Sequence, residues 1–136
     1  MSPGKKGTSR TGTFLTERAL RDVRDIESYS IERWGNQTAQ RYIDKIEAVL
    51  NRISERPDLL RKEPDFAESL RFHRVEKHVL VCDVQEQTIY VLTVLHTSMD
   101  IPKRLAKLLP QLSIEADLLH SQVTAAIKQN RRGRQR

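Results

Sequence analysis

The stretch Lys77–Asp100, KHVLVCDVQEQTIYVLTVLHTSMD, contains two runs rich in Val, Ile and Leu. The first run spans residues 79–84, the second spans residues 88–95, and the polar triplet 85–87 lies between them. β-Branched runs of this length on either side of a short polar break are typical of an antiparallel β-hairpin. We therefore predict that this hairpin forms the centre of the fold.

The second run is apolar at nearly every position rather than at every second one. A strand with one exposed face alternates apolar and polar side chains, so a continuous apolar run indicates that both faces are covered. We predict that helices of this chain cover one face of the strand and that a partner covers the other.

The composition is that of a single globular domain. The chain has 136 residues, of which 38% are hydrophobic and 31% are charged, and this length is sufficient to bury a core. The net charge of +6 favours encounters with polyanions or acidic partners. The single cysteine, Cys82, excludes a disulfide within the chain. We expect a cytoplasmic protein without a membrane segment, because no apolar run reaches the roughly 18 residues of a membrane span and the first residues lack a signal peptide's apolar segment.

Two amphipathic helices are predicted before the hairpin. Thr16 is a suitable N-cap for the first helix, Gly35 ends it, and Asn36 can cap the second. Apolar positions recur at three- and four-residue steps, which predicts two buried stripes that face each other. The stripes comprise Ala19, Val23, Ile26, Ser30 and Trp34 in the first helix, and Ala39, Tyr42, Ile43, Ile46, Val49, Leu50 and Ile53 in the second. We expect Tyr29 and Trp34 to pack in the core.

Further elements flank these helices and the hairpin. Residues 69–75 alternate in character and predict a strand, so that the chain has three consecutive antiparallel strands, while Phe14 and Leu15 are a candidate edge strand. These elements predict an α+β fold in which a helical hairpin packs on a small antiparallel sheet.

An additional C-terminal helix is predicted after the sheet. Pro102 is suited to the first turn of a short helix that ends at Leu109, and Pro110 is expected to break it before a second helical segment at residues 113–129. We accordingly divide the chain into a disordered N-terminal arm at 1–12, a folded domain at 13–109 and a helical extension with a basic tail at 110–136.

The order of these elements, together with the local sequence, resembles the RelE/ParE toxin superfamily of type II toxin–antitoxin systems, and ParE in particular. The resemblance covers about residues 13–105. It rests on the segments LTERALRDVRDIESYSIERWG (15–35), AQRYIDKIEAVLNRI (39–53), LRFHRVEKHVLVCDV (70–84) and VLTVLHTSMDIPKRL (91–105). The extension after Pro110 departs from the short family pattern.

The resemblance implies a small toxin that a cognate antitoxin, a ParD-like or similar small acidic protein, neutralises. ParE-like members of the superfamily poison DNA gyrase, and RelE-like members cut mRNA on the ribosome. We expect the ParE-like activity, in which the protein binds a gyrase–DNA intermediate and does not act as an enzyme. The first alternative is a ribosome-dependent mRNA endonuclease, and the second is an antitoxin-binding remnant without a toxic target.

Cleavage of RNA through its ribose 2′-hydroxyl needs a base, an acid and a cation that stabilises the developing charge. Arg71, His73, His78 and His96 are the candidates, since they lie on predicted neighbouring strands. Their side chains converge only in certain strand registers, which the sequence leaves open. The Lys, Arg and Tyr set of RelE-type nucleases is not recognisable in this sequence.

The remaining candidates concern binding and structure. We predict that a groove between the helical hairpin and the sheet takes an acidic antitoxin helix. The candidate partner-binding residues are the cations Arg21, Arg24, Arg41, Lys45, Arg71, Lys103 and Arg104. We assign structural roles to Trp34 and Tyr42, and to His96 and Asp100 at the entry to the last helix. We expect no metal or other cofactor, because the histidines lack acidic neighbours at ligand spacing.

Overall fold

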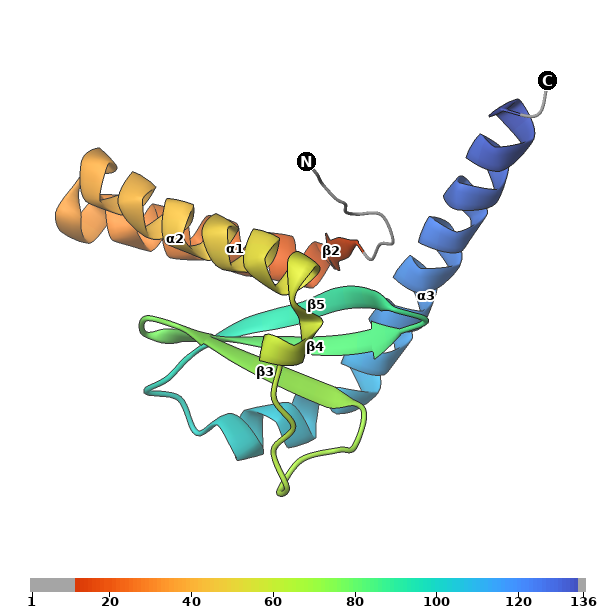
Figure 1. The fold of residues 1–136 in the computed structure, drawn as a ribbon. Coiled ribbons are helices and arrows are strands. Elements are labelled where there is room, and N and C mark those ends of the chain that lie inside the picture. The colour runs from red at the N-terminus through yellow and green to blue at the C-terminus, as the bar shows by residue number, and fades with distance from the viewer. Residues whose placement is uncertain (1–11, 135–136) are drawn as a thin grey trace.

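The computed structural model describes residues 12–134 and the side chains of residues 12–130. A four-stranded sheet lies between a helical hairpin on one face and a long C-terminal helix on the other (Figure 1). In chain order, the elements are β2 (Thr13–Leu15), α1 (Glu17–Trp34), α2 (Asn36–Glu55), the short 3₁₀ helix η1 (Pro57–Leu59), β3 (Leu70–Val75), β4 (His78–Gln85), β5 (Thr88–His96) and α3 (Ile101–Arg134).

The strands have the order β2-β5-β4-β3 across the sheet. The predicted hairpin of β4 and β5 is confirmed, and β3 pairs antiparallel with β4. The candidate edge strand is also confirmed, although it runs parallel to β5. The sheet is therefore mixed rather than purely antiparallel. The turn between β4 and β5 consists of Glu86 and Gln87, whose positive φ angles of 51° and 67° match the twist of a two-residue hairpin.

The two predicted helices form the hairpin of α1 and α2. Thr16 caps α1 as predicted, because its Oγ1 accepts a hydrogen bond of 3.1 Å from the backbone N–H of Ala19. Gly35 joins the helices at a φ of 89°, a left-handed conformation in which residues with a Cβ are strained. The short connection places α1 and α2 side by side over the sheet (Figure 1).

An irregularity in β5 determines which of its side chains point to each face of the sheet. Val81 pairs with Thr93 and Cys82 pairs with Val91, so β5 carries one extra residue opposite this point of β4. This bulge changes the alternation of side chains. Val91 and Val94, three residues apart, consequently both contact the helical hairpin.

Asp22 of α1 fixes the helical hairpin to the bulge. Its Oδ2 accepts a hydrogen bond of 2.5 Å from the hydroxyl of Thr93 and one of 3.0 Å from the backbone N–H of Val94. The bulge disrupts the hydrogen-bond ladder between the strands, and Asp22 thus provides an acceptor for the backbone N–H of Val94.

Two separate clusters of buried side chains form the core, one on each face of the sheet. The first lies between the sheet and the helical hairpin and includes Ile46, Ile53, Leu80, Ile89 and Val91. The second lies between the sheet and α3 and includes Leu70, Phe72, Tyr90, Leu92, Leu95, Leu105, Leu112 and Ala116. The prediction that a partner covers the second face is therefore wrong, since α3 of the same chain covers it.

The predicted helix break at Pro110 is also wrong, because α3 continues from Ile101 to Arg134 with Pro110 inside it. A proline within a helix costs about 3 kcal/mol. The burial of Leu105 and Leu112 on either side of Pro110 contributes about 1.5–3 kcal/mol for each side chain. Packing against the sheet thus offsets the cost, and the boundary that we placed between residues 109 and 110 falls inside one helix.

Two further observations concern the described residues. No helix among residues 12–134 is long and apolar enough to cross a membrane. Cys82 is fully buried in β4, and burial raises the pKa of its thiol. The expected disordered arm at residues 1–12 lies outside the described residues except for Gly12.

Candidate functional site

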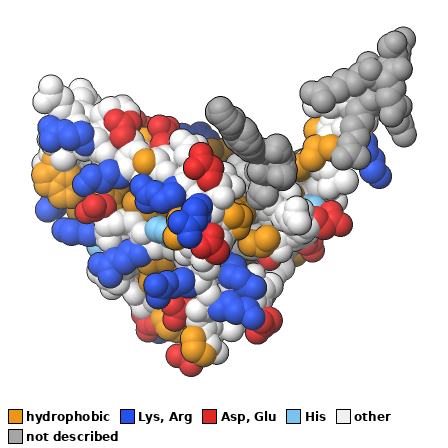
Figure 2. All heavy atoms as spheres, viewed as in Figure 1, with side chains coloured by type: hydrophobic (Ala, Val, Ile, Leu, Met, Phe, Trp, Pro, Cys, Tyr) orange, Lys and Arg blue, Asp and Glu red, His pale blue; other side chains and the backbone are white. Residues whose placement is uncertain are grey.

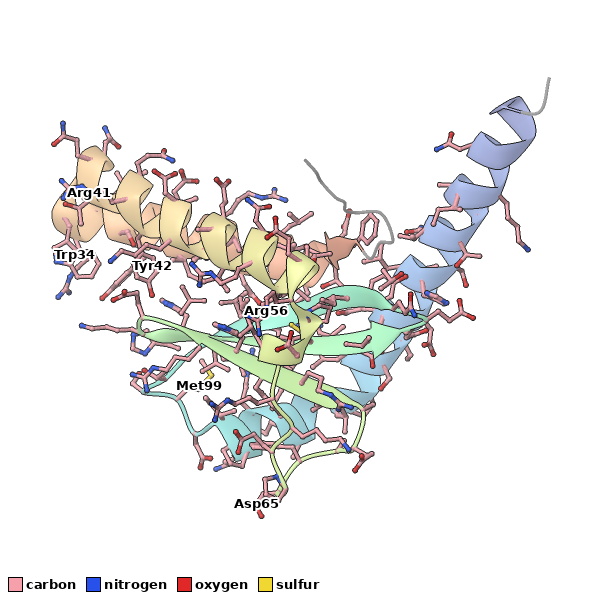
Figure 3. The ribbon with its side chains drawn as sticks, in the orientation of Figure 1. Trp34, Arg41, Tyr42, Arg56, Asp65 and Met99 are labelled. Atoms are coloured by element: carbon pink, nitrogen blue, oxygen red, sulfur yellow. The ribbon has the colours of Figure 1, made fainter. Side chains whose placement is uncertain are left out.

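An open cleft of about 580 Å³ lies between the free end of the helical hairpin and the edge of the sheet where β4 begins and β5 ends. The free end of the hairpin extends past the sheet, so its sheet-facing side is uncovered there (Figure 1). Trp34 and Tyr42 project from this side, toward the sheet edge (Figure 3). The cleft is lined by Asp25, Ile26, Tyr29, Ser30, Trp34, Thr38, Arg41, Tyr42, Lys45, Lys77, His78 and His96.

Tyr29 and Trp34 form the outer wall of the cleft, and the prediction that they pack in the core is wrong. Their exposed fractions are 54% and 53%. The two rings meet edge to face with centroids 6.0 Å apart, and the guanidinium of Arg33 lies within 6 Å of both rings. The apolar stripe of the helical hairpin is buried where the sheet lies beneath it, for example at Ile43. The stripe continues along the helical hairpin past the point where the sheet ends. The aromatic side chains therefore remain in contact with solvent.

Tyr42, His78 and His96 form the floor of the cleft. The hydroxyl of Tyr42 lies 2.6 Å from Nδ1 of His78 and accepts a hydrogen bond of 3.2 Å from the backbone N–H of Lys77. His78 and His96 are direct partners in the β4–β5 ladder, and their ring centroids are 5.0 Å apart. The strand register, which the sequence left open, thus brings these two candidate histidines together.

Burial and the neighbouring His96 lower the pKa of His78 to about 4. His78 is therefore uncharged at neutral pH. Burial also raises the pKa of Tyr42. Because both groups are neutral near pH 7, the floor is polar but carries no charge from either of them.

The rim of the cleft is positively charged. Arg41, Lys45 and Lys77 line it, and Asp25 is the only acidic residue among the lining side chains. Lys45 also contacts Glu76 at 3.3 Å, in an ion pair whose two side chains are at least half exposed. Figure 2 shows a hydrophobic patch at the free end of the hairpin with Lys and Arg side chains around it. This combination suits an apolar ligand that carries negative charge.

The structure separates two of the four candidate nuclease residues from the cleft. The guanidinium of Arg71 donates hydrogen bonds to the backbone carbonyls of Glu68 and Leu70. His73 has its Nδ1 2.9 Å from the carbonyl of Arg74. Neither side chain lines the cleft that contains His78 and His96.

The candidate partner-binding cations do not share one surface. Arg41 and Lys45 lie at the rim of the cleft, whereas Arg21 and Arg24 are exposed on α1 and do not line it. Lys103 and Arg104 lie in the first turns of α3, in the layer on the opposite face of the sheet (Figure 1).

His96 and Asp100 each bond to nearby backbone. Nδ1 of His96 accepts a hydrogen bond of 3.0 Å from the N–H of Ser98, and Oδ1 of Asp100 accepts one of 3.3 Å from the N–H of Lys103. Asp100 thereby satisfies a free donor of the first turn of α3. His96 consequently shapes the loop after β5 while its ring also lines the cleft.

Sequence reasoning missed the side chains that attach α3 to the rest of the protein. Nδ1 of His120 on α3 lies 2.6 Å from the hydroxyl of Tyr90, and its Nε2 lies 3.3 Å from Glu86. Arg18 of α1 forms a bidentate ion pair with Glu115, with both N–O distances at 2.9 Å. These partners are distant in sequence, and no local pattern relates them.

The fold and the cleft define a small α+β protein with an aromatic cleft rimmed by cations, and comparison with known proteins gives the family. Residues 14–101 match the model of the family described as ParE toxin of type II toxin–antitoxin system, parDE. The chain belongs to this family and is a ParE-type toxin by sequence. The match ends at the first residue of α3, so nearly all of α3 lies outside the family model.

Two curated relatives agree with this assignment. Toxin ParE of Escherichia coli is 31% identical over 97 residues, which cover 71% of this chain and 94% of that protein. Toxin ParE1 of Caulobacter vibrioides is 30% identical over 86 residues, which cover 63% of this chain and 88% of that protein.

A solved structure supports the fold. The structure of the chromosomal ParDE system from P. aeruginosa matches with a TM-score of 0.57 at 15% identity, over 63% of this chain and 95% of that chain. The predicted α+β architecture of a helical hairpin on a sheet is thus confirmed.

Proposed function

We propose that this protein is the toxin of a ParDE-type module, that it inhibits DNA gyrase by binding a gyrase–DNA intermediate, and that an acidic segment of its antitoxin occupies the cleft. The observation that carries the proposal is the cleft itself. It combines an aromatic wall at Tyr29 and Trp34 with a rim of three cations, and such a surface suits an amphipathic acidic segment that folds as it binds.

The chemistry of the described residues favours binding over RNA cleavage. A general base or acid works best when its pKa lies near the operating pH. The pKa of His78 is about 4, so this side chain is a weak base and holds almost no proton to donate at neutral pH. Arg71, the candidate for stabilising charge on phosphorus, is bonded to backbone carbonyls outside the cleft.

The activity is tested with purified protein in two parallel assays. Incubation with gyrase, ATP and supercoiled plasmid should accumulate cleaved DNA, while an in vitro translation reaction should leave its mRNA intact. Codon-spaced mRNA cuts without cleaved plasmid would replace this proposal with the endonuclease alternative. Normal growth of cells that express the chain alone would favour a remnant without a toxic target.

Occupation of the cleft is tested with two matched charge reversals on the helical hairpin. R41E/K45E changes the rim of the cleft, and R21E/R24E changes exposed positions on α1 outside it. We expect the first variant to bind the acidic product of the adjacent gene at least about 10-fold more weakly, and the second to change the Kd much less. Equal effects of both variants in a calorimetric titration would contradict a cleft-specific site.

A further inference from the structure

The end of α3 combines three features that the toxin family and the cleft do not account for. It is helical, it projects from the body of the protein, and its charge has one sign. After Asp117 the sequence contains Lys128, Arg131, Arg132, Arg134 and Arg136 but no Asp or Glu. Nearly all of this helix lies outside the family model.

The first half of α3 packs on the rest of the protein and anchors the basic end. Leu112 and Ala116 are buried against the sheet. The bidentate pair of Arg18 and Glu115 joins α3 to α1, and the contact of His120 with Tyr90 joins it to β5. The basic end is thus the continuation of an anchored helix rather than a separate tail.

Beyond this anchored half, α3 extends past the sheet. Residues 125–130 are all exposed, and α3 continues to Arg134 away from the other elements (Figure 1). At 1.5 Å per residue, the ten residues 125–134 form a rod of about 15 Å. The side chains of residues 125–130, the described part of this rod, are thus accessible to solvent.

The cationic residues at the end of α3 lie close enough along the helix to repel one another and to contact the same polyanion. Positions 128, 131 and 132 are related by steps of three and four residues, which places them on one side of a helix. Like charges at this spacing destabilise a helix, and no acidic residue of the segment offsets them. A polyanion would remove this repulsion, and a helix of 10–12 Å diameter fits the major groove of B-DNA, which is about 12 Å wide.

We propose that residues 125–134 of α3 form a DNA-binding element that contacts the phosphates of duplex DNA. The inference goes beyond the proposed function, because it concerns naked DNA and a segment remote from the cleft. It is consistent with a target that contains DNA, since the helix would add a second contact to a gyrase–DNA complex. Contacts to phosphates are independent of sequence, so we expect binding without base specificity.

The test is the binding of the full-length protein to a fluorescent duplex of about 24 base pairs, measured by anisotropy from about 50 to 200 mM salt. The test variant is K128Q/R131Q/R132Q/R134Q. The matched control is R52Q/R56Q/K62Q/K107Q, which removes the same number of cations from exposed positions away from the end of α3. Circular dichroism checks that both variants keep their helix content.

Each lost phosphate contact should reduce the slope of log affinity against log salt by about 0.9. Across this salt range, the affinity of the wild type should therefore fall about 100-fold more than that of the α3 variant. The control variant should retain most of the slope. Equal slopes for the wild type and the α3 variant would overturn the proposal, and so would an equal loss in the control.

Two competitors establish the class of polyanion. Single-stranded RNA and polyglutamate are added at the same charge concentration as the duplex. The proposal expects unlabelled duplex DNA to displace the probe most efficiently, and stronger displacement by either competitor would overturn it. Because gyrase is absent, failure of this experiment is distinct from failure of the plasmid-cleavage assay.

Discussion

His78 binds its proton less tightly than an ordinary histidine because its ring is half-buried beside His96. Its Nδ1 contacts the Tyr42 hydroxyl, which is itself bonded to the backbone of Lys77. These contacts connect α2 to the turn between β3 and β4. The contacts therefore join the helical hairpin to the sheet at the floor of the cleft.

The low pKa of His78 predicts a pH dependence of stability. The pKa is about 4 in the folded protein and about 6.5 in the unfolded chain, so the unfolded chain binds more protons between these values. Stability should accordingly fall as the pH is lowered from about 6.5 toward 4. Urea unfolding of the wild type and of H78Q at pH 7.5 and 4.5 measures this effect. The wild type should lose more stability than H78Q, and equal losses would show that His78 has an ordinary pKa.

α3 is the element that most distinguishes this chain from a minimal member of its family, because the family model ends where α3 begins. The helix has two parts with different surroundings. Its first part covers the second face of the sheet through Leu105, Leu112 and Ala116, whereas Ile114 and Leu118 on the same stretch are about 60% exposed. Because Leu112 is buried and Leu118 is exposed on the same helix, substituting each of them distinguishes a loss of packing from a loss of helix propensity.

Leu112→Ala should destabilise the protein by about 2–5 kcal/mol, because it leaves a cavity in the core beside the sheet. The matched change Leu118→Ala removes the same atoms from an exposed position and should alter stability by no more than about 0.5 kcal/mol. Chemical denaturation of both variants provides the comparison. Similar small values for the two variants would mean that α3 does not pack on the sheet in solution.

In the protein as a whole, the sheet separates two cores and needs a cover on each face. The helical hairpin supplies one cover and α3 supplies the other, so the chain itself buries the surface that we had expected a partner to bury. The cleft at one end of the molecule, a second hollow beside β3 and the start of α3, and the projecting end of α3 remain open.

Truncation at two points tests this arrangement. Removing residues 110–136 should expose the sheet face that includes Phe72, Tyr90 and Leu92, and the product should aggregate or unfold at a much lower temperature. Removing only residues 125–136 leaves that core intact and should shift Tm by no more than about 2 °C. A stable, soluble product ending at Leu109 would contradict the role of α3 as the second cover.

Sequence patterns predict the elements whose causes are local. Continuous β-branched runs specify the β4–β5 hairpin, and the side chain of Thr16 with the φ freedom of Gly35 specifies where α1 begins and ends. The family resemblance supported the α+β architecture more strongly than the periodicity of apolar residues alone. These features depend on neighbouring residues, and sequence patterns report neighbouring residues directly.

What each apolar stripe packs against depends on the three-dimensional arrangement of the elements. Helical periodicity shows that Trp34 lies on an apolar face, but not that the sheet ends before it. Leu112 lay outside both predicted helical segments, and only the packing of α3 on the sheet buries it. The strand register placed His78 beside His96 and left Arg71 elsewhere. Burial against the sheet likewise outweighed the local cost of Pro110. Each outcome depends on the free energy of contacts between residues far apart in the chain, which no local pattern contains.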